Sequence, residues 1–135
     1  MSYTTETIDD GRGILLVGTG EVSGKDLTSG ASGVLKLVQN GLTPSFALID
    51  LAAVTKFSVS SDEITLNASL SRQIAQHLPT VTVAIVAPAD HVYGMARMWQ
   101  TYMDSTGWTT RVFRRRDEAV LWLRKEAGAS QPNIL

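Results

Sequence analysis

The chain has 135 residues, of which 44% are hydrophobic and 19% are charged, and its formal net charge at pH 7 is -1. These values predict one globular domain that buries its own core and lacks the concentrated basic surface that nucleic-acid binding needs. The absence of cysteine excludes disulfides, cysteine-based zinc sites and thiol catalysis.

The first predicted elements form a β-hairpin. Tyr3–Ile8 and Gly13–Val17 have strand character, and Asp9–Gly11 between them is a turn signal. The glycine-rich segment 18–24 is predicted to end the second strand.

A helix follows this segment, with Asp26 or Thr28 as its N-cap and Asn40–Gly41 at its end. Gly30 and Gly33 lower the intrinsic propensity of this helix, so packing must hold it in place. Apolar residues at helical spacing form its inward row: Leu27, Ala31, Val34 and Val38.

The rest of the chain alternates between strands and helices. Phe46–Leu51 is a continuous apolar run, typical of a central strand that is buried on both faces. The pattern then predicts, in order, a helix over Ser61–His77, a strand over Val81–Ala87, a helix over His91–Ser105, a strand over Thr109–Phe113 and a helix over Asp117–Glu126.

This alternation predicts an α/β fold. We expect a mixed sheet of four or five strands covered by about four helices, with the N-terminal hairpin as its antiparallel edge. The chain contains no linker or repeat, so we expect one domain over residues 1–127 and a flexible C-terminal tail over residues 128–135.

Several of these segments resemble a known family. Asp50–Val54, followed by Phe57 and a serine cluster, resembles the Asp-Leu…Val…Ser-Ser stretch of STAS-type domains, and Val22–Lys25 lies where such domains enter their first helix. The later segments resemble the SpoIIAA-like family of that superfamily: Val83–Val86, Met95–Met98, Val112–Phe113 and Glu118–Leu123. The resemblance covers nearly the whole chain and implies a single STAS-like, SpoIIAA-like domain. Its relatives include anti-anti-sigma factors, transporter-associated domains and lipid-binding domains of similar topology.

Ser58, Ser60 and Ser61 form a polar cluster before the second predicted helix. In anti-anti-sigma relatives a serine at this place is phosphorylated to break partner binding, so the resemblance implies Ser60 as a phosphorylation candidate. The helix dipole and free amides favour a phosphate there. The chain departs from the family's Asp-Ser-Ser-Gly pattern, however, and Asp62 and Glu63 would repel a phosphate. Ser60 and Glu63 also fit a capping box, which is the interpretation that we favour.

The glycines of segment 18–24 invite a nucleotide-binding interpretation, which the spacing argues against. A P-loop requires Gly-x-x-x-x-Gly-Lys-Ser/Thr, but its first glycine would fall on Thr19, and Asp26 follows Lys25. A dinucleotide-binding fingerprint fails as well, because three residues rather than two separate its second and third glycines. We therefore interpret the segment as a strand end and helix entry.

Asp90 and His91 follow a predicted strand, at the edge where α/β sheets place ligands. They are candidates for an acid–base pair, but Asp90 as the N-cap of the next helix is the interpretation that we favour. The two histidines of the chain have no carboxylate partners at metal-binding spacing, so no metal site is predicted.

The third predicted helix has a broad apolar face, which consists of Val92, Met95, Ala96, Trp99, Tyr102 and Met103. Tyr93 and Arg97 lie on the opposite face, and Met98 extends the apolar side beyond what one sheet contact needs. Such a stripe usually packs into the core, but its methionines and aromatic residues also suit a partner or an apolar ligand. Tyr93, Arg97 and Met98 are therefore candidate contact residues, and Leu66 and Leu121 add candidate exposed apolar area.

The only basic cluster is Arg111 with the run Arg114–Arg116. Asp117 and Glu118 follow at once, and alternation along the strand points the arginines to different faces. We interpret the cluster as a solvated edge or a salt-bridged subunit contact, rather than as a nucleic-acid groove.

Together these features predict a non-catalytic binding or regulatory module, without a cofactor, that acts through protein–protein contacts. Three alternatives stay open: a carrier of lipids or other apolar small molecules, a phosphoserine switch, and an enzyme that uses Asp90 or His91. A solid interior beside the third helix would count against the carrier. The excess apolar surface also leads us to expect a homodimer. The sequence lacks a bilayer-length apolar run, and its N-terminal residues lack signal-peptide features. We therefore expect a cytoplasmic protein without membrane insertion, and we expect it to be bacterial.

Overall fold

The structure is a computed structural model and describes residues 2–129. Strands and helices alternate along most of this range. In chain order they are β1 (Tyr3–Ile8), the 3₁₀ turn Asp9–Gly11, β2 (Gly13–Ser23), α1 (Gly24–Gln39), β3 (Phe46–Ser58), α2 (Ser61–His77), β4 (Thr82–Val86), α3 (Asp90–Met103), β5 (Thr109–Phe113) and α4 (Arg116–Ala127).

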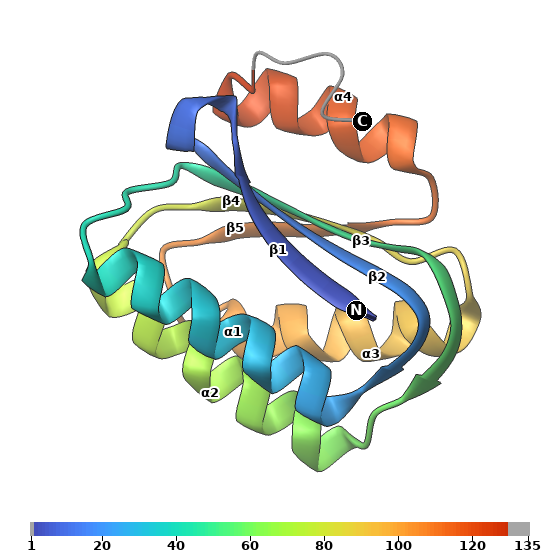
Figure 1. Ribbon diagram of the computed structural model, residues 1–135. Helices are drawn as coiled ribbons and strands as arrows, with labels where there is room; N and C mark the ends of the chain where they lie inside the picture. The colour runs from blue at the N-terminus through green and yellow to red at the C-terminus, as the bar shows by residue number, and fades with distance from the viewer. Residues whose placement is uncertain (1, 130–135) are drawn as a thin grey trace.

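The strands form one mixed sheet with the order β1-β2-β3-β4-β5 (Figure 1). β1 and β2 are antiparallel, whereas β2, β3, β4 and β5 run parallel to one another. Each parallel pair is connected through a helix, as parallel neighbours require. The predicted α/β class, mixed sheet, four helices and N-terminal hairpin are confirmed.

The hairpin turn is built by two aspartates. Asp9 and Asp10 have positive φ angles of 53° and 55°, a conformation that aspartate tolerates better than most residues. Gly11 continues the turn with a φ of 84°. The buried Asp9 carboxylate lies 3.4 Å from the Arg12 guanidinium, which ties the turn to the start of β2.

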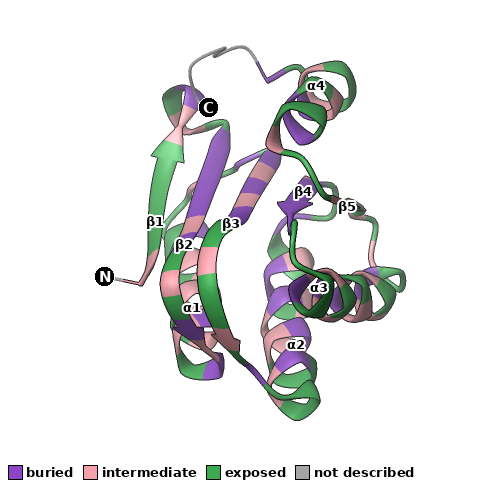
Figure 2. Ribbon diagram, turned by 90° about the vertical axis from the view of Figure 1, so that its right-hand side faces the viewer, coloured by how far each residue is buried: buried purple, intermediate pink, exposed green. Residues whose placement is uncertain are grey.

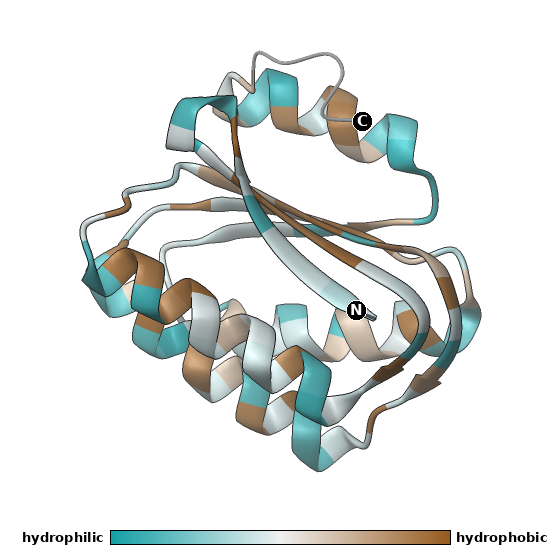
Figure 3. Ribbon diagram, in the orientation of Figure 1, coloured by the Kyte–Doolittle hydropathy of each residue, from teal (hydrophilic) through white to brown (hydrophobic). Residues whose placement is uncertain are grey.

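The helices cover the two faces of the sheet unequally. α1, α2 and α3 lie on one face and α4 lies alone on the other (Figures 1 and 2). The larger core cluster lies under the three helices, and a smaller one, centred on Phe46 and Leu48, lies under α4. Figure 3 shows hydrophobic residues along the central strands, whereas β1 is mostly hydrophilic, as suits an edge strand.

β2 and β3 are longer than the sequence pattern predicts. The pattern predicts strands over Gly13–Val17 and Phe46–Leu51, and both predicted ends are wrong, because the two strands stay paired to Ser23 and Ser58. The pairing shifts register twice near Gly18 and Gly20, so the glycines bend the strand without ending it. Pairing with a neighbouring strand overrides the weak strand propensity of these segments.

The helix starts agree with prediction at α2 and differ at α1 and α3. The N-cap of α1 is Ser23, whereas Asp26 and Thr28 lie inside the helix. Ala89 occupies the N-cap position of α3, and Asp90 is its first helical residue. The prediction of Asp90 as N-cap is therefore wrong.

Of the predicted tail, residues 130–135 lie outside the described part of the chain. The two described residues of this segment are held in place. Gly128 has a φ of 66° and ends α4, and its carbonyl oxygen accepts a hydrogen bond of 3.1 Å from Arg12. Ala129 is buried in the smaller core cluster.

Candidate functional site

The serine cluster lies at the tip of a two-stranded extension. β4 pairs with β3 only as far as Asp50, and β1 pairs with β2 only over Gly13–Gly18. Beyond these points β2 and β3 continue as a pair, which we call the β2–β3 extension (residues 19–23 and 52–58). The extension curves toward the starts of α1 and α2 (Figure 1). The fold thus places the serines at an exposed corner of the molecule.

Ser60 caps α2 through a complete capping box. Its hydroxyl oxygen accepts a hydrogen bond of 3.2 Å from the Glu63 amide, and the Glu63 carboxylate accepts bonds from the Ser60 amide at 2.9 Å and hydroxyl at 3.1 Å. The predicted capping role is confirmed. Ser58 ends β3, Ser61 begins α2, and both are exposed. Neither hydroxyl has a hydrogen-bond partner within residues 2–129.

The starts of α1 and α2 are in contact at this corner. A matching capping box joins Ser23 and Asp26, whose amide and carboxylate groups bond at 2.9–3.2 Å. Gly24 leaves room for the Glu63 side chain, because a β-carbon at position 24 would overlap the carboxylate. Glu63 therefore caps its own helix and also fills the space against the first residue of α1.

His91 lies beside the β2–β3 extension, and its side chain is separated from the carboxylate of Asp90. Its ring meets the Phe57 ring edge-on, with 6.0 Å between the ring centres. Asp90 is turned to the other side, where its carboxylate is 2.6 Å from the Arg114 guanidinium. The two neighbours therefore do not form the candidate acid–base pair.

Tyr93 and Arg97 belong to a second surface, a groove between α3 and β5 with a volume of about 410 Å³. The Arg114 guanidinium lies 4.0 Å from the centre of the Tyr93 ring, in cation–π geometry. Arg97 is exposed and lines the groove together with Arg111. Met98 is partly buried and packs against the larger core cluster. The groove therefore has Tyr93 and Arg97 on its wall, whereas Met98 packs toward the core.

Each arginine of the run Arg114–Arg116 pairs with an acid of the same chain. Arg114 contacts Asp90, Arg115 contacts Asp117 at 2.7 Å, and Arg116 lies 3.3 Å from Asp50. The hydrogen bond from Arg115 holds the pKa of the exposed Asp117 carboxyl below its ordinary value. Two of these pairs fasten the β5–α4 connection, because Arg114 holds it to the start of α3 and Arg116 holds it to β3.

Asp50 is a buried acid with a structural role. One carboxylate oxygen accepts a hydrogen bond of 3.0 Å from the Ala52 amide, at the point where β3 loses β4 as its neighbour. The other oxygen faces Arg116 from α4. The acid thus links the open edge of β3 to the start of α4.

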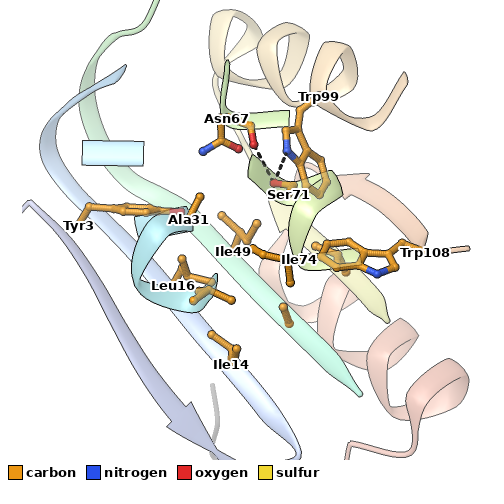
Figure 4. Close-up of a pocket in the computed structure, with 13 residues that line it drawn as sticks. Tyr3, Ile14, Leu16, Ala31, Ile49, Asn67, Ser71, Ile74, Trp99 and Trp108 are labelled. Carbon is orange, nitrogen blue, oxygen red and sulfur yellow. Dashed lines mark hydrogen bonds between the residues drawn. The ribbon is translucent and has the colours of Figure 1, made fainter. Parts of the chain in front are cut away.

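The interior beside α3 contains a hollow that the sequence pattern does not locate (Figure 4). Two adjoining spaces of about 70 and 50 Å³ share four lining residues, Tyr3, Ile49, Asn67 and Trp99. The apolar stripe of α3 signals one wall. The other walls come from elements far apart in sequence, and their polar members give no local signal.

No group of three or more histidine and acidic side chains within residues 2–129 is arranged to hold a metal ion. Within the same range, no helix has the length and the apolar content needed to cross a bilayer.

Comparison with known proteins found similarity at the level of structure. No protein-family model matches the sequence, and no curated protein matches it. A DUF3478-family protein with a SpoIIAA-like fold, from Shewanella loihica PV-4, is 19% identical over 90% of this chain and 91% of its own, with a TM-score of 0.57.

Two structures of SpoIIAA also match. The anti-sigma factor antagonist SpoIIAA in its unphosphorylated form is 11% identical over 90% of this chain and 97% of its own, with a TM-score of 0.56. The phosphorylated form of SpoIIAA, a Bacillus cell fate determinant, is 11% identical over 90% of this chain and 99% of its own, with a TM-score of 0.53. The chain therefore has a SpoIIAA-like fold, as its sequence resemblance implies.

Proposed function

We propose that this chain is a non-catalytic regulatory module that binds a protein partner through the corner formed by Ser58, Ser60, Ser61 and His91. The observation that carries the proposal is the exposed start of α2 at the tip of the β2–β3 extension. Backbone at this tip is held by pairing and by the two capping boxes, so the corner is a preformed surface.

The likeness to SpoIIAA supports a regulatory role. One matching structure is named an anti-sigma factor antagonist, and SpoIIAA was determined in both unphosphorylated and phosphorylated forms. A protein with that name acts on a protein partner, and the resemblance in sequence implies that a serine at the start of this helix controls the contact. We carry both features to this chain as part of the proposal.

A phosphate on Ser60 would act through Glu63. The Ser60 hydroxyl and the Glu63 carboxylate are 3.1 Å apart, so a phosphate with a charge of about -2 would repel Glu63 from the cap. The phosphate would take over the helix amides, which favour an anion. Glu63 would then leave its place against Gly24, and the contact between the starts of α1 and α2 would change. This gives phosphorylation a structural effect at the proposed partner surface.

A non-catalytic role is supported by the contacts of Asp90 and His91, the candidate acid and base. Asp90 is paired with Arg114, and His91 packs against Phe57.

Self-association is part of the proposal, although Leu66 on α2 and Leu121 on α4 lie on helices that cover opposite faces of the sheet. They therefore do not form one patch. We further propose that the protein is located in the cytoplasm of a bacterium, which agrees with the absence of cysteine from the sequence.

Site-directed photo-crosslinking in the source cells tests the partner surface. A photoreactive residue at Ser61 is expected to capture one protein reproducibly, whereas the same residue at Glu6, on the far edge strand, is not. Phosphoserine at position 60 is expected to reduce the Ser61 adduct at least tenfold. Equal adducts from Ser61 and Glu6 would refute the surface, and an unchanged adduct with phosphoserine would refute the switch. Sedimentation velocity of the purified chain tests the homodimer.

A further inference from the structure

The hollow beside α3 follows from how the three helices sit on the sheet. α1 rests on β1 and β2, and α3 rests on β3 and β5. α2 packs on α1 and α3, so it bridges the two helices above the middle strands. Long side chains, such as Ile49 from β3 and Trp99 from α3, must fill the space under this bridge. They leave the two adjoining spaces unfilled.

The walls of the hollow are apolar, and no lining residue is charged. The polar groups that reach it are largely committed to partners. Trp99 Nε1 donates to Ser71 Oγ at 3.3 Å, Ser71 donates to the Asn67 carbonyl oxygen at 3.0 Å, and the Asn67 side-chain amide donates to the Leu27 carbonyl oxygen at 3.0 Å. With these groups engaged, a water molecule in the hollow would find few hydrogen-bond partners, which favours an apolar occupant.

Two aromatic residues lie at opposite ends of the larger space (Figure 4). Trp108 is fixed, because its Nε1 donates to the Leu78 carbonyl oxygen at 2.7 Å. Tyr3 belongs to the edge strand β1 and is partly exposed as a residue, although burial of its phenol raises the pKa of the Tyr3 hydroxyl. The phenol is therefore neutral at physiological pH, and both ends of the space present uncharged rings.

We propose that the hollow under α2 binds a small, neutral, apolar molecule about the size of one ring, which enters beside Tyr3. A cavity of about 150 Å³ lined by apolar side chains holds benzene. The two spaces, of about 70 and 50 Å³, are each smaller than this and have Ile49 and Trp99 as shared walls, so a ligand of one ring must displace one of these side chains to occupy both spaces. A fatty acyl chain exceeds this volume, so the carrier alternative is narrowed to single-ring or short-chain ligands. The proposal stands independently of the partner surface at Ser60.

Thermal unfolding with matched probes tests the proposal. Toluene and indole are the probes, and benzoate, of similar size but charged, is the control ligand. At a tenfold excess over Kd, a bound probe is expected to raise Tm by about 5 °C, and benzoate is expected to leave it unchanged. A wild-type protein that responds to neither toluene nor indole overturns the proposal, as does an equal response to benzoate.

Two variants of the same strand locate the binding. Ala47→Ile fills the larger space and is expected to abolish the shift, whereas Ala53→Ile, on the exposed part of β3, is expected to retain it. An unchanged shift in Ala47→Ile would place the ligand elsewhere and overturn the proposal. If Ala47→Ile does not fold, Ile49→Ala serves instead. It joins and enlarges the two spaces and is expected to increase the indole shift at least twofold, and no increase would overturn the proposal.

Discussion

Gly30 and Gly33 lie about one turn apart on α1 and form a matched pair for testing how Tyr3 packs. Apart from its chain neighbours and the nearby helix backbone, no described atom lies within 4 Å of a methyl group added at Gly33. At Gly30 the same methyl would lie 2.5 Å from Tyr3 Cε2 and 2.9 Å from Cδ2. The two substitutions to alanine therefore share a gain in helix propensity and differ in one steric contact.

The expected magnitudes follow from these two contributions. Gly33→Ala is expected to raise the free energy of unfolding by about 1 kcal/mol, the difference in helix propensity between alanine and glycine. Gly30→Ala gains the same amount but overpacks against the Tyr3 ring, at a cost of about 1–3 kcal/mol. The Gly30 variant should therefore be less stable than the Gly33 variant by about 1–3 kcal/mol, or roughly 4–12 °C in Tm.

Urea unfolding at a common m value measures both free energies. Adding Tyr3→Ala to each variant removes the ring and is expected to make the two glycine substitutions equivalent. Equal stability of the Gly30 and Gly33 variants in the presence of Tyr3 would refute the packing described for β1 against α1. It would also remove the closed end that Tyr3 gives to the hollow.

Substitutions at Ser60, Asp50 and Tyr3 test other features of the structure. Ser60→Ala removes the α2 cap and should lower the free energy of unfolding by about 1 kcal/mol. Ser60→Thr keeps a hydroxyl that can accept a hydrogen bond from the Glu63 amide, so it should lower this free energy less, and equal losses in urea titrations would contradict the capping box. Asp50→Asn weakens the contact with Arg116 and should lower the free energy of unfolding by about 1–3 kcal/mol in the same assay. A loss below about 0.5 kcal/mol, which is typical of surface substitutions, would show that the pair contributes little to stability. Burial raises the pKa of Tyr3, so the unfolded chain loses this proton first and stability falls as pH rises above about 10. Tyr3→Phe should lose less stability over that range, and parallel curves for both proteins would contradict a buried phenol.

Elements with strong local signals could be predicted from the sequence. β1, α2 and β5 have the predicted bounds, because their signals act within a few residues. Ser60 and Glu63 define the start of α2 through hydrogen bonds across three positions, and the Asp9–Gly11 turn places β1 beside β2. These interactions form between near neighbours, so a linear pattern contains them.

The site could be predicted only in part. The sequence singles out the serine cluster, Asp90, His91, Tyr93, Arg97 and Met98, but it does not say which of them share a surface. The structure groups the serines with His91 through Phe57 and places Tyr93 and Arg97 in a separate groove. Two of the three acidic partners of the arginine run, Asp90 and Asp50, are 24 and 66 positions from Arg114 and Arg116. No local rule selects such partners.

The sequence by itself determined the order of elements, the hairpin edge, the cap of α2 and the resemblance to a SpoIIAA-like fold. Tertiary structure decided the lengths of β2 and β3, because strand pairing outweighs the propensity of the glycine-rich segment. It also decided the hollow under α2, whose walls come from three helices and four strands. Local signals act through contacts a few residues apart, whereas a cavity depends on how far whole elements stand from one another.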